Sequence, residues 1–310
     1  MELTLEHVSK KYKENDVVKD VNVSLKPGVH ALLGANGSGK TTLMRLICGL
    51  LKGEGSIHFD DIDASLEYEN FASHIGYIPQ NFGYYPHYTL KEFLDYMAIV
   101  KNLNKDYSEK RILSLVKELG LENQLNKKMK TLSGGMLRRV GIIQALLSEP
   151  EILILDEPTA GLDPKERIVF RNLIASLSQS TIILLSTHIV SDIESIADDI
   201  LIMKEGEIIM HGIYEDLIKV IKGKVWEVLV PKQEASSFMK RYRVVKSHNQ
   251  NNGVYMRIVS DLKPHDEAIA VIPDLDDLYL NSCCILPFLV NDCRRSRRIT
   301  RNCESLLFMN

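Results

Sequence analysis

The chain has 310 residues, of which 45% are hydrophobic, 25% charged and 7% aromatic, and its formal net charge is −3. These values are typical of a globular protein and exclude a disordered, collagen-like or coiled-coil chain. The slightly acidic balance argues against non-specific binding of nucleic acid. The length predicts one large domain plus a smaller one, or two domains.

Signals for membranes, secretion and metals are weak. No stretch approaches the roughly 20 apolar residues that a helix needs to span a bilayer. The first ten residues show no basic segment followed by an apolar run, so we expect a cytoplasmic protein. Cys48 stands alone and the other cysteines lie between residues 283 and 303 without a C-x-x-C pair, which favours reduced thiols over a metal site.

Short apolar runs and helical periodicity alternate through the first two thirds of the chain. The expected strands are residues 3–8, 21–25, 29–33, 75–78, 152–155, 181–186 and 200–204. The expected helices are residues 41–51, 90–101, 109–119, 134–147, 165–176 and 189–196. Continuous apolar strands that alternate with helices predict an α/β fold with a parallel sheet covered on both faces.

The pattern weakens after Gly212. A helix at 214–221, strands at 226–230 and 255–259, and short helices at 264–271 and 274–280 predict a small accessory domain over residues 213–280. The main domain then covers residues 1–212. Residues 281–310 contain five arginines and no lysine or glycine, and we interpret them as a surface extension or a sequence artefact without an assigned function.

A glycine-rich loop follows the expected strand at 29–33 and opens the helix at 41–51. Its sequence, GANGSGKT, fits the phosphate-binding pattern G-x-x-x-x-G-K-[ST] in the structural context that supports it. Its glycines allow backbone N–H groups to surround a triphosphate at the positive end of a helix. The residues expected to bind nucleotide here are Gly34, Asn36, Gly37, Ser38, Gly39, Lys40, Thr41 and Thr42. Lys40 is expected to reach the β- and γ-phosphates and Thr41 to ligate Mg²⁺.

Two acidic residues end the apolar strand at 152–155. A buried strand rarely ends in paired carboxylates unless something cationic compensates them. Asp156 is placed to hold Mg²⁺, and Glu157 is placed to polarise an attacking water. A helix-capping acid is the plain alternative, and the nearby Lys40 loop makes it less favoured.

The segment Leu132-Ser133-Gly134-Gly135-Met136, followed by Arg138 and Arg139, resembles the signature motif of ABC-type ATPases. Other elements of that family follow in order over residues 1–212. Tyr12 resembles the aromatic residue that stacks on adenine, Gln80 the Q-loop glutamine, Asp163 the D-loop aspartate and His188 the switch histidine. Each of these residues alone is more often structural, and their ordered occurrence carries the resemblance. Met136 replaces the glutamine that is frequent in the family, and drug- and antibiotic-export members share this methionine.

The resemblance implies a P-loop NTPase fold with an antiparallel β subdomain, a helical subdomain and the small C-terminal domain. It implies a head-to-tail dimer, with a second copy or a paralogous ATPase, in which Ser133, Gly134 and Gly135 of one chain face the nucleotide on the other. ATP would be hydrolysed with Lys40, Glu157 and His188 as catalytic residues, and Thr41, Gln80 and Asp156 would hold Mg²⁺. His188 would contact the γ-phosphate.

The resemblance also implies a transporter subunit, of an exporter, on the inner face of the cell membrane. The aromatic loop at 82–88 would dock a polytopic membrane subunit, and its residues are Phe82, Tyr84, Tyr85, Pro86 and Tyr88. A locally packed lid is the alternative for this loop. A soluble ABC-type ATPase acting on ribosomes or nucleic acid is the alternative function, although only one cassette is present and no room exists for a long coiled coil. A regulatory module with degraded catalysis is disfavoured by the intact site residues.

Overall fold

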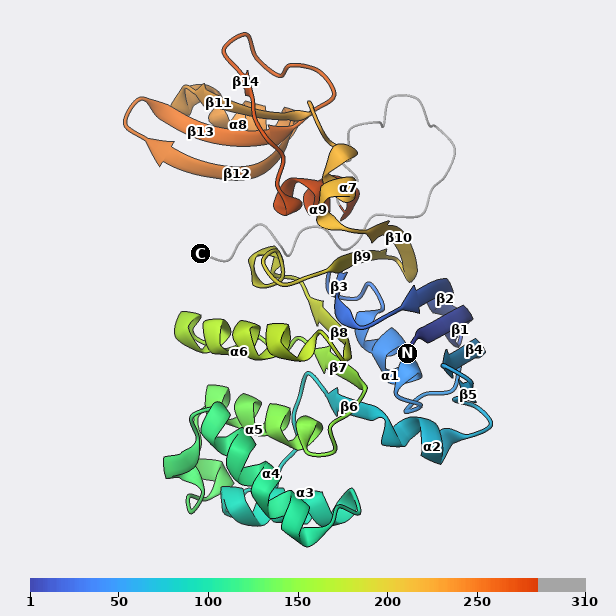
Figure 1. Ribbon diagram of the computed structural model, residues 1–310. Helices are drawn as coiled ribbons and strands as arrows, with labels where there is room; N and C mark the ends of the chain where they lie inside the picture. Colours follow the sequence, from blue (N-terminus) through green and yellow to red (C-terminus); the bar gives the residue numbers. More distant parts are fainter. Residues whose placement is uncertain (284–310) are drawn as a thin grey trace. The chain divides into compact units, whose positions relative to one another are not determined.

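The computed structural model describes residues 1–283, drawn as a ribbon in Figure 1. Met1–Val220 and Asp274–Tyr279 form one compact unit, and Ile221–Pro273 with residues 280–283 form another. The sequence places the boundary after residue 212, whereas the compact units divide after Val220. The helix α7 (Tyr214–Lys219) therefore belongs to the first unit. The predicted tail lies outside the described residues from position 284 onward.

A six-stranded sheet forms the centre of the first unit. Its order is β10 (Glu207–Gly212), β9 (Asp199–Lys204), β3 (Gly28–Leu33), β8 (Ile182–Thr187), β7 (Ile152–Asp156) and β6 (Ile75–Ile78). All neighbours are parallel except β10 and β9. Every residue of β3, β7 and β8 is buried, as expected of central strands with both faces covered. The carboxyl ends of these three strands therefore meet at one edge, where ligands bind in open α/β sheets.

An antiparallel sheet packs beside this central sheet. It contains β1 (Leu3–Tyr12), β2 (Asn15–Leu25), β4 (Glu54–Phe59) and β5 (Ile62–Asp63) in the order β2-β1-β4-β5. The helix α1 (Lys40–Ile47) shares one apolar core with both sheets, and α2 (Tyr68–Ser73) adds Phe71 to it. This core fixes the helix that carries the glycine-rich loop against the strand that precedes it.

Three helices form a separate group, drawn in green in Figure 1: α3 (Leu90–Val100), α4 (Lys105–Glu118) and α5 (Gly134–Leu146). Single-turn 3₁₀ helices at Glu122–Gln124 and Met129–Thr131 connect α4 to α5. Side chains cap all three helix starts: Thr89 caps α3, Asn104 caps α4 and Ser133 caps α5. Because such caps satisfy N–H groups that a helix start leaves unpaired, they set the position at which each helix begins.

The second unit contains an antiparallel sheet in the order β12 (Arg243–Gln250), β13 (Gly253–Val259), β11 (Val225–Val230) and β14 (Ile269–Ala270). The helix α8 (Lys232–Arg241) covers one face, where Phe238 and Tyr242 pack on Val228, Met256 and Ile258. The chain then continues into α9 (Leu275–Cys283). This unit has its own small apolar core.

Two of the predicted helices are wrong. Residues 189–196 form only the 3₁₀ turn Val190–Asp192, because several N–H groups bond the carbonyl three residues back rather than four. Residues 264–271 form a loop and the edge strand β14, which pairs with β11 at Trp226 and Glu227. Elsewhere in the first 200 residues the predicted strands and helices are present, although β4, β5 and α2 were not anticipated.

The remaining α6 (Pro164–Leu177) begins at the cap Asp163. Among residues 1–283, no helix combines the length and the apolar character that crossing a membrane requires. Cys48 is buried and reduced.

Candidate nucleotide site

The glycine-rich loop connects the end of β3 to the start of α1. Gly39 precedes the helix with φ of 109°, in the left-handed region that favours glycine, and an added Cβ would lie 2.4 Å from the Val17 carbonyl oxygen. No side chain caps α1, and its first turn contains no acidic residue. The N–H groups at this helix start are therefore arranged to receive an anion, and the helix dipole has the matching sign.

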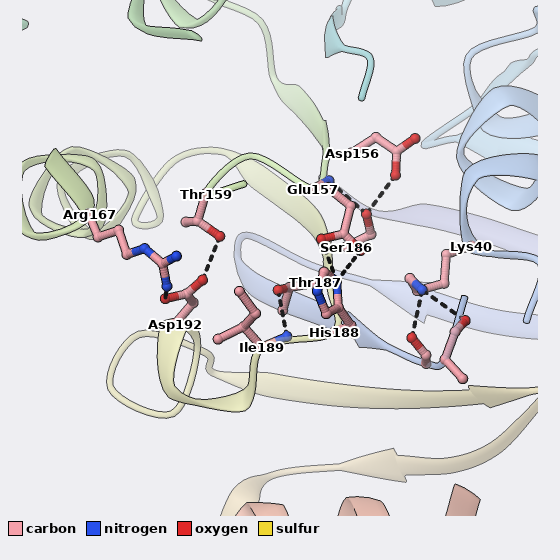
Figure 2. A network of polar contacts seen from close by, with 12 residues as sticks. Lys40, Asp156, Glu157, Thr159, Arg167, Ser186, Thr187, His188, Ile189 and Asp192 are labelled. Carbon is pink, nitrogen blue, oxygen red and sulfur yellow. Dashed lines mark hydrogen bonds and ion pairs between the residues drawn. The ribbon is translucent and has the colours of Figure 1, made fainter. Parts of the chain in front are cut away.

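A pocket of about 310 Å³ lies over this loop. Residues 36–42 line it, together with Gln80, Glu157 and Val17. The side chain of Lys40 is buried, and its ammonium donates to the carbonyl oxygens of Gly34 at 2.6 Å and Ala35 at 3.2 Å. The loop thus holds its own lysine, which lines the pocket, and Figure 2 shows its two hydrogen bonds as dashed lines. The folding of the first unit brings Gln80 and Glu157 to the phosphate loop from distant parts of the sequence.

Asp156 ends β7 and is completely buried. Its Oδ1 accepts a hydrogen bond of 2.7 Å from the Ser186 hydroxyl, whereas its Oδ2 is a buried oxygen without a hydrogen-bond partner. A buried carboxylate oxygen without a donor is costly, so an unsatisfied one in a folded protein calls for an explanation. A cation at Oδ2 would supply the missing partner.

The residues present therefore fit a magnesium ion. Mg²⁺ prefers oxygen ligands and usually takes one or two carboxylates together with substrate phosphates. Asp156 does not itself line the pocket, but it offers the unpartnered carboxylate oxygen, and its chain neighbour Glu157 lines the pocket together with Thr41 and Gln80, which carry a hydroxyl and an amide oxygen. This donor set contains only hard oxygen ligands, which suits Mg²⁺ rather than a soft metal.

Glu157 has a backbone conformation that non-glycine residues rarely adopt, with φ of 51°. Its N–H donates to the Ser186 hydroxyl at 2.9 Å, so one buried serine holds both acidic residues. Strained backbone of this kind is found at functional sites, where the surrounding structure maintains it. The turn directs the Glu157 side chain into the pocket rather than along the strand.

His188 follows β8 and contacts Glu157 directly. Its Nδ1 lies 3.0 Å from Oε1 and 2.9 Å from Oε2 of that carboxylate, as Figure 2 shows. Because a carboxylate only accepts, Nδ1 carries the proton, and the other ring nitrogen, Nε2, remains for a further contact. The sequence predicts separate roles for these residues, whereas the structure joins them in one pair.

Other predicted nucleotide-binding residues do not line this pocket. Ser133 and Gly134 are exposed at the start of α5, where the Ser133 hydroxyl accepts from the Met136 N–H at 3.2 Å. Asp163 caps α6 through the Glu166 N–H at 2.8 Å. Tyr12 is 44% exposed at the end of β1. These positions are open to a partner or a ligand, and the pocket of a single chain does not include them.

Sequence reasoning missed several residues that build the site. Val17 lines the pocket from β2, and Ser186 binds both acidic residues from β8. Asp192 is buried. It accepts a hydrogen bond from Thr159 and forms an ion pair of 2.9 Å with Arg167. This network, on the left of Figure 2, ties the turn after Glu157 to the turn after His188. The sequence offers one signal for Ser186, which is its position two residues before His188.

Comparisons with known proteins agree with this geometry. Residues 18–160 match the ABC transporter family model. An uncharacterised ABC transporter ATP-binding protein of Bacillus subtilis, YdbJ, is 38% identical over 210 residues, which cover 66% of this chain and 67% of YdbJ. The linearmycin resistance ATP-binding protein LnrL of Bacillus subtilis is 33% identical over 224 residues, which cover 71% of this chain and 72% of LnrL.

Solved structures give the same result. The dimeric structure of the ABC transporter cassette MJ0796 superposes with a TM-score of 0.63 at 28% identity, covering 68% of this chain and 98% of that cassette. A dimeric post-hydrolysis state of MJ0796 bound to ADP and Pi superposes with a TM-score of 0.61. The chain belongs to the ABC transporter family, as an ATP-binding subunit with ATPase activity. The predicted fold, a P-loop NTPase of the ABC type, is confirmed.

Proposed function

We propose that this ATPase couples ATP binding and hydrolysis, at the interface of a head-to-tail dimer, to export of a substrate through separate membrane subunits. The observation that carries the proposal is a single pocket that combines the phosphate loop, Gln80 and Glu157 beside the unpartnered oxygen of Asp156. These are the groups that phosphoryl transfer needs for positioning and charge stabilisation.

Each residue of the site has a chemical task in this proposal. The N–H groups of residues 36–42 and the Lys40 ammonium bind the triphosphate in the pocket. Tyr12, which lies outside the pocket at the end of β1, supports the adenine. Thr41, Gln80 and Asp156 would hold Mg²⁺, which would neutralise part of the phosphate charge. Glu157 accepts a hydrogen bond from the attacking water and orients it.

The Glu157–His188 pair gives the histidine a defined tautomer. With Nδ1–H donated to Glu157, Nε2 of His188 remains for the γ-phosphate, and because phosphate oxygens accept hydrogen bonds, Nε2 would donate to it when both ring nitrogens carry a proton. His188 is exposed, in contrast to the buried Glu157, so it lies where an added ligand can reach it. We infer that His188 senses the presence of the γ-phosphate and that its loss permits reopening.

The position of the signature segment, outside the pocket of its own chain, supports the dimer. Ser133 and Gly134 begin a helix whose dipole favours an anion, yet they do not line the pocket of their own chain. A two-fold dimer would bring this segment to the nucleotide of the partner and would be self-complementary. The dimeric structure of the similar cassette MJ0796 supports dimerisation of this chain.

The substitution Glu157→Gln tests this function. We expect ATP binding to persist, hydrolysis to fall by a factor of about 100 or more, and an ATP-dependent dimer to accumulate in size-exclusion chromatography with light scattering. Glu69→Gln, a change of the same kind on α2, is the matched control and should hydrolyse ATP like the wild type. Turnover of Glu157→Gln close to that of the wild type would contradict the assignment of Glu157.

The loop at 82–88 has two parts with different environments. Phe82 is half-buried, and its ring meets that of the buried Phe93 edge to face at 5.7 Å. Tyr85 and Tyr88 are 47% and 39% exposed and stack at 5.0 Å, and Tyr96 of α3 lies edge-on to both. We propose that these three tyrosines, which we call the tyrosine cluster, dock the membrane subunit, because exposed aromatic groups are favoured interface anchors.

Co-purification from cell membranes tests the docking of a membrane subunit on the tyrosine cluster. The tagged protein should recover a polytopic membrane protein in mild detergent, and Tyr85→Ala with Tyr88→Ala should lose it. Tyr68→Ala, another exposed tyrosine, is the matched control and should retain it. Recovery with ribosomes or nucleic acid would instead support the soluble alternative.

Export is inferred from similarity to LnrL, a linearmycin resistance protein, and from Met136 in the signature segment. Deletion of the gene should increase cellular accumulation of the cargo of the recovered membrane partner. Decreased accumulation would show import and would refute this part of the proposal.

A further inference from the structure

Arg138 lies in the second turn of α5 and is buried, with 7% of its surface exposed. Its guanidinium makes hydrogen bonds to five backbone carbonyl oxygens. Nε donates to Pro158 at 3.0 Å, and Nη1 donates to Pro79 at 3.0 Å and Gln80 at 3.1 Å. Nη2 donates to Asp156 at 2.7 Å and also to Glu157. A guanidinium has five N–H donors, so each of them has a carbonyl partner here.

The five carbonyls come from two segments that carry site residues. Pro79 and Gln80 belong to the loop that places Gln80 in the pocket, and residues 156–158 form the turn that places the two acidic side chains. Arg138 itself belongs to the helix that begins with the signature segment. One side chain thus joins three motifs that the sequence separates widely.

The charge of Arg138 also suits this position. Burial lowers the pKa of the guanidinium, and the negative charges of Asp156 and Glu157 oppose that shift. A guanidinium remains charged in proteins, so the buried cation compensates the two acidic groups. Planar five-donor geometry is specific to arginine, and lysine cannot reproduce it.

We propose that Arg138 is a positioning residue that transmits engagement of the signature segment to the Gln80 loop and the Glu157 turn of the same chain. This inference rests on the proposed dimer function. In that dimer the signature segment contacts the nucleotide of the partner, whereas Gln80 and Glu157 serve the nucleotide of their own chain. Arg138 therefore couples the two ATP sites.

The test compares Arg138→Met with Arg111→Met. Methionine keeps the apolar stem but removes the guanidinium donors of all five carbonyls, of which the Glu157 carbonyl still accepts from the Ala160 N–H at 3.3 Å. Arg111 is the matched control, because its guanidinium also donates to a backbone carbonyl, that of Leu146 at 3.3 Å, and pairs with Glu149 at 3.5 Å, and these partners lie outside the Gln80 loop and the Glu157 turn. Purified variants would be compared in ATPase rate against ATP concentration, and in binding of a fluorescent ATP analogue.

We expect Arg138→Met to bind the analogue with unchanged affinity while kcat falls at least about tenfold, because small misplacement of reacting groups is costly. The Hill coefficient should fall from above 1 in the wild type to about 1. Arg111→Met should retain the wild-type values. This separation of binding, rate and cooperativity is not expected of a residue that only supports the fold.

A wild-type rate and Hill coefficient in Arg138→Met would overturn the inference. If Arg138→Met does not fold, Arg138→Lys is tested in its place. Loss of ATPase rate and cooperativity in Arg138→Lys supports the inference, and wild-type values of both refute it. A wild type that neither hydrolyses ATP nor dimerises with it would instead contradict the proposed function.

Discussion

The hydroxyl of Ser186 offers the sharpest test of how the site is held together, through the substitution Ser186→Ala. The hydroxyl donates to Asp156 and accepts from the Glu157 N–H, and all three groups are buried. The alanine leaves a carboxylate oxygen and an N–H group without partners. Loss of a hydrogen bond to a buried charged group costs about 1.5–3 kcal/mol, and an unsatisfied buried N–H adds a similar amount. We therefore expect a destabilisation of about 3–6 kcal/mol.

Thermal unfolding and steady-state kinetics measure this effect. For a domain of this size, 1 kcal/mol shifts Tm by about 2–4 °C, so Ser186→Ala should unfold roughly 10 °C below the wild type. The value of kcat should also fall about tenfold, because the turn that carries Glu157 loses its anchor. Ser178→Ala, which removes a 3.0 Å bond to the Ala175 carbonyl on the surface, is the matched control. Equal Tm shifts in the two variants would refute the reasoning.

Three further predictions concern the phosphate loop, the metal carboxylate and a histidine remote from the site. Gly39→Ala should weaken ATP binding at least tenfold in a titration, since φ of 109° and the Val17 carbonyl exclude a Cβ, whereas Gly83→Ala should bind normally because its Cβ meets nothing within 4 Å. Asp156→Asn should abolish turnover and make nucleotide affinity insensitive to Mg²⁺, and a persisting Mg²⁺ dependence would contradict the proposed ligand. The hydrogen bond to Asp199 raises the pKa of His211 above its ordinary value, so this pair stabilises the fold below about pH 6.5 and loses its effect as the pH rises through the folded-state pKa. His211→Gln should accordingly lower the free energy of unfolding in urea more at about pH 6 than at about pH 9, and an equal loss at both would refute the linkage.

Much of the fold follows from local patterns in the sequence. Apolar runs such as residues 152–155 and 200–204 form strands of the central sheet, and Ser133 caps α5 as its hydroxyl chemistry favours. The local pattern fails at 189–196, where Ile189, Ile193 and Ile196 have helical spacing. There the buried Asp192 binds Thr159 and Arg167, and these contacts coincide with a single 3₁₀ turn. The spacing of apolar residues along the chain carries no information about such tertiary contacts.

The candidate site also has a part that the sequence predicts and a part that it does not. The glycine-rich loop can be predicted from the sequence, because a continuous segment supplies the helix start, the glycines and Lys40. The pair Glu157 and His188, the shared hydrogen bonds of Ser186 and the five carbonyls around Arg138 join residues from separate elements. Their identities are visible in the sequence, but their partners depend on the order β3-β8-β7-β6 of the central sheet.

The sequence by itself determined the class of protein and predicted the residues of the phosphate loop, because that chemistry requires particular side chains at fixed local spacing. Only the tertiary structure decided which oxygen of Asp156 remains for a cation and that Glu157 turns into the pocket beside His188. The tertiary structure alone also showed that Arg138 joins the signature helix to the Gln80 loop and to the Glu157 turn. A hydrogen bond depends on distance and direction to within fractions of an ångström, and parallel strands from distant parts of the chain acquire those distances only when they pack into one sheet.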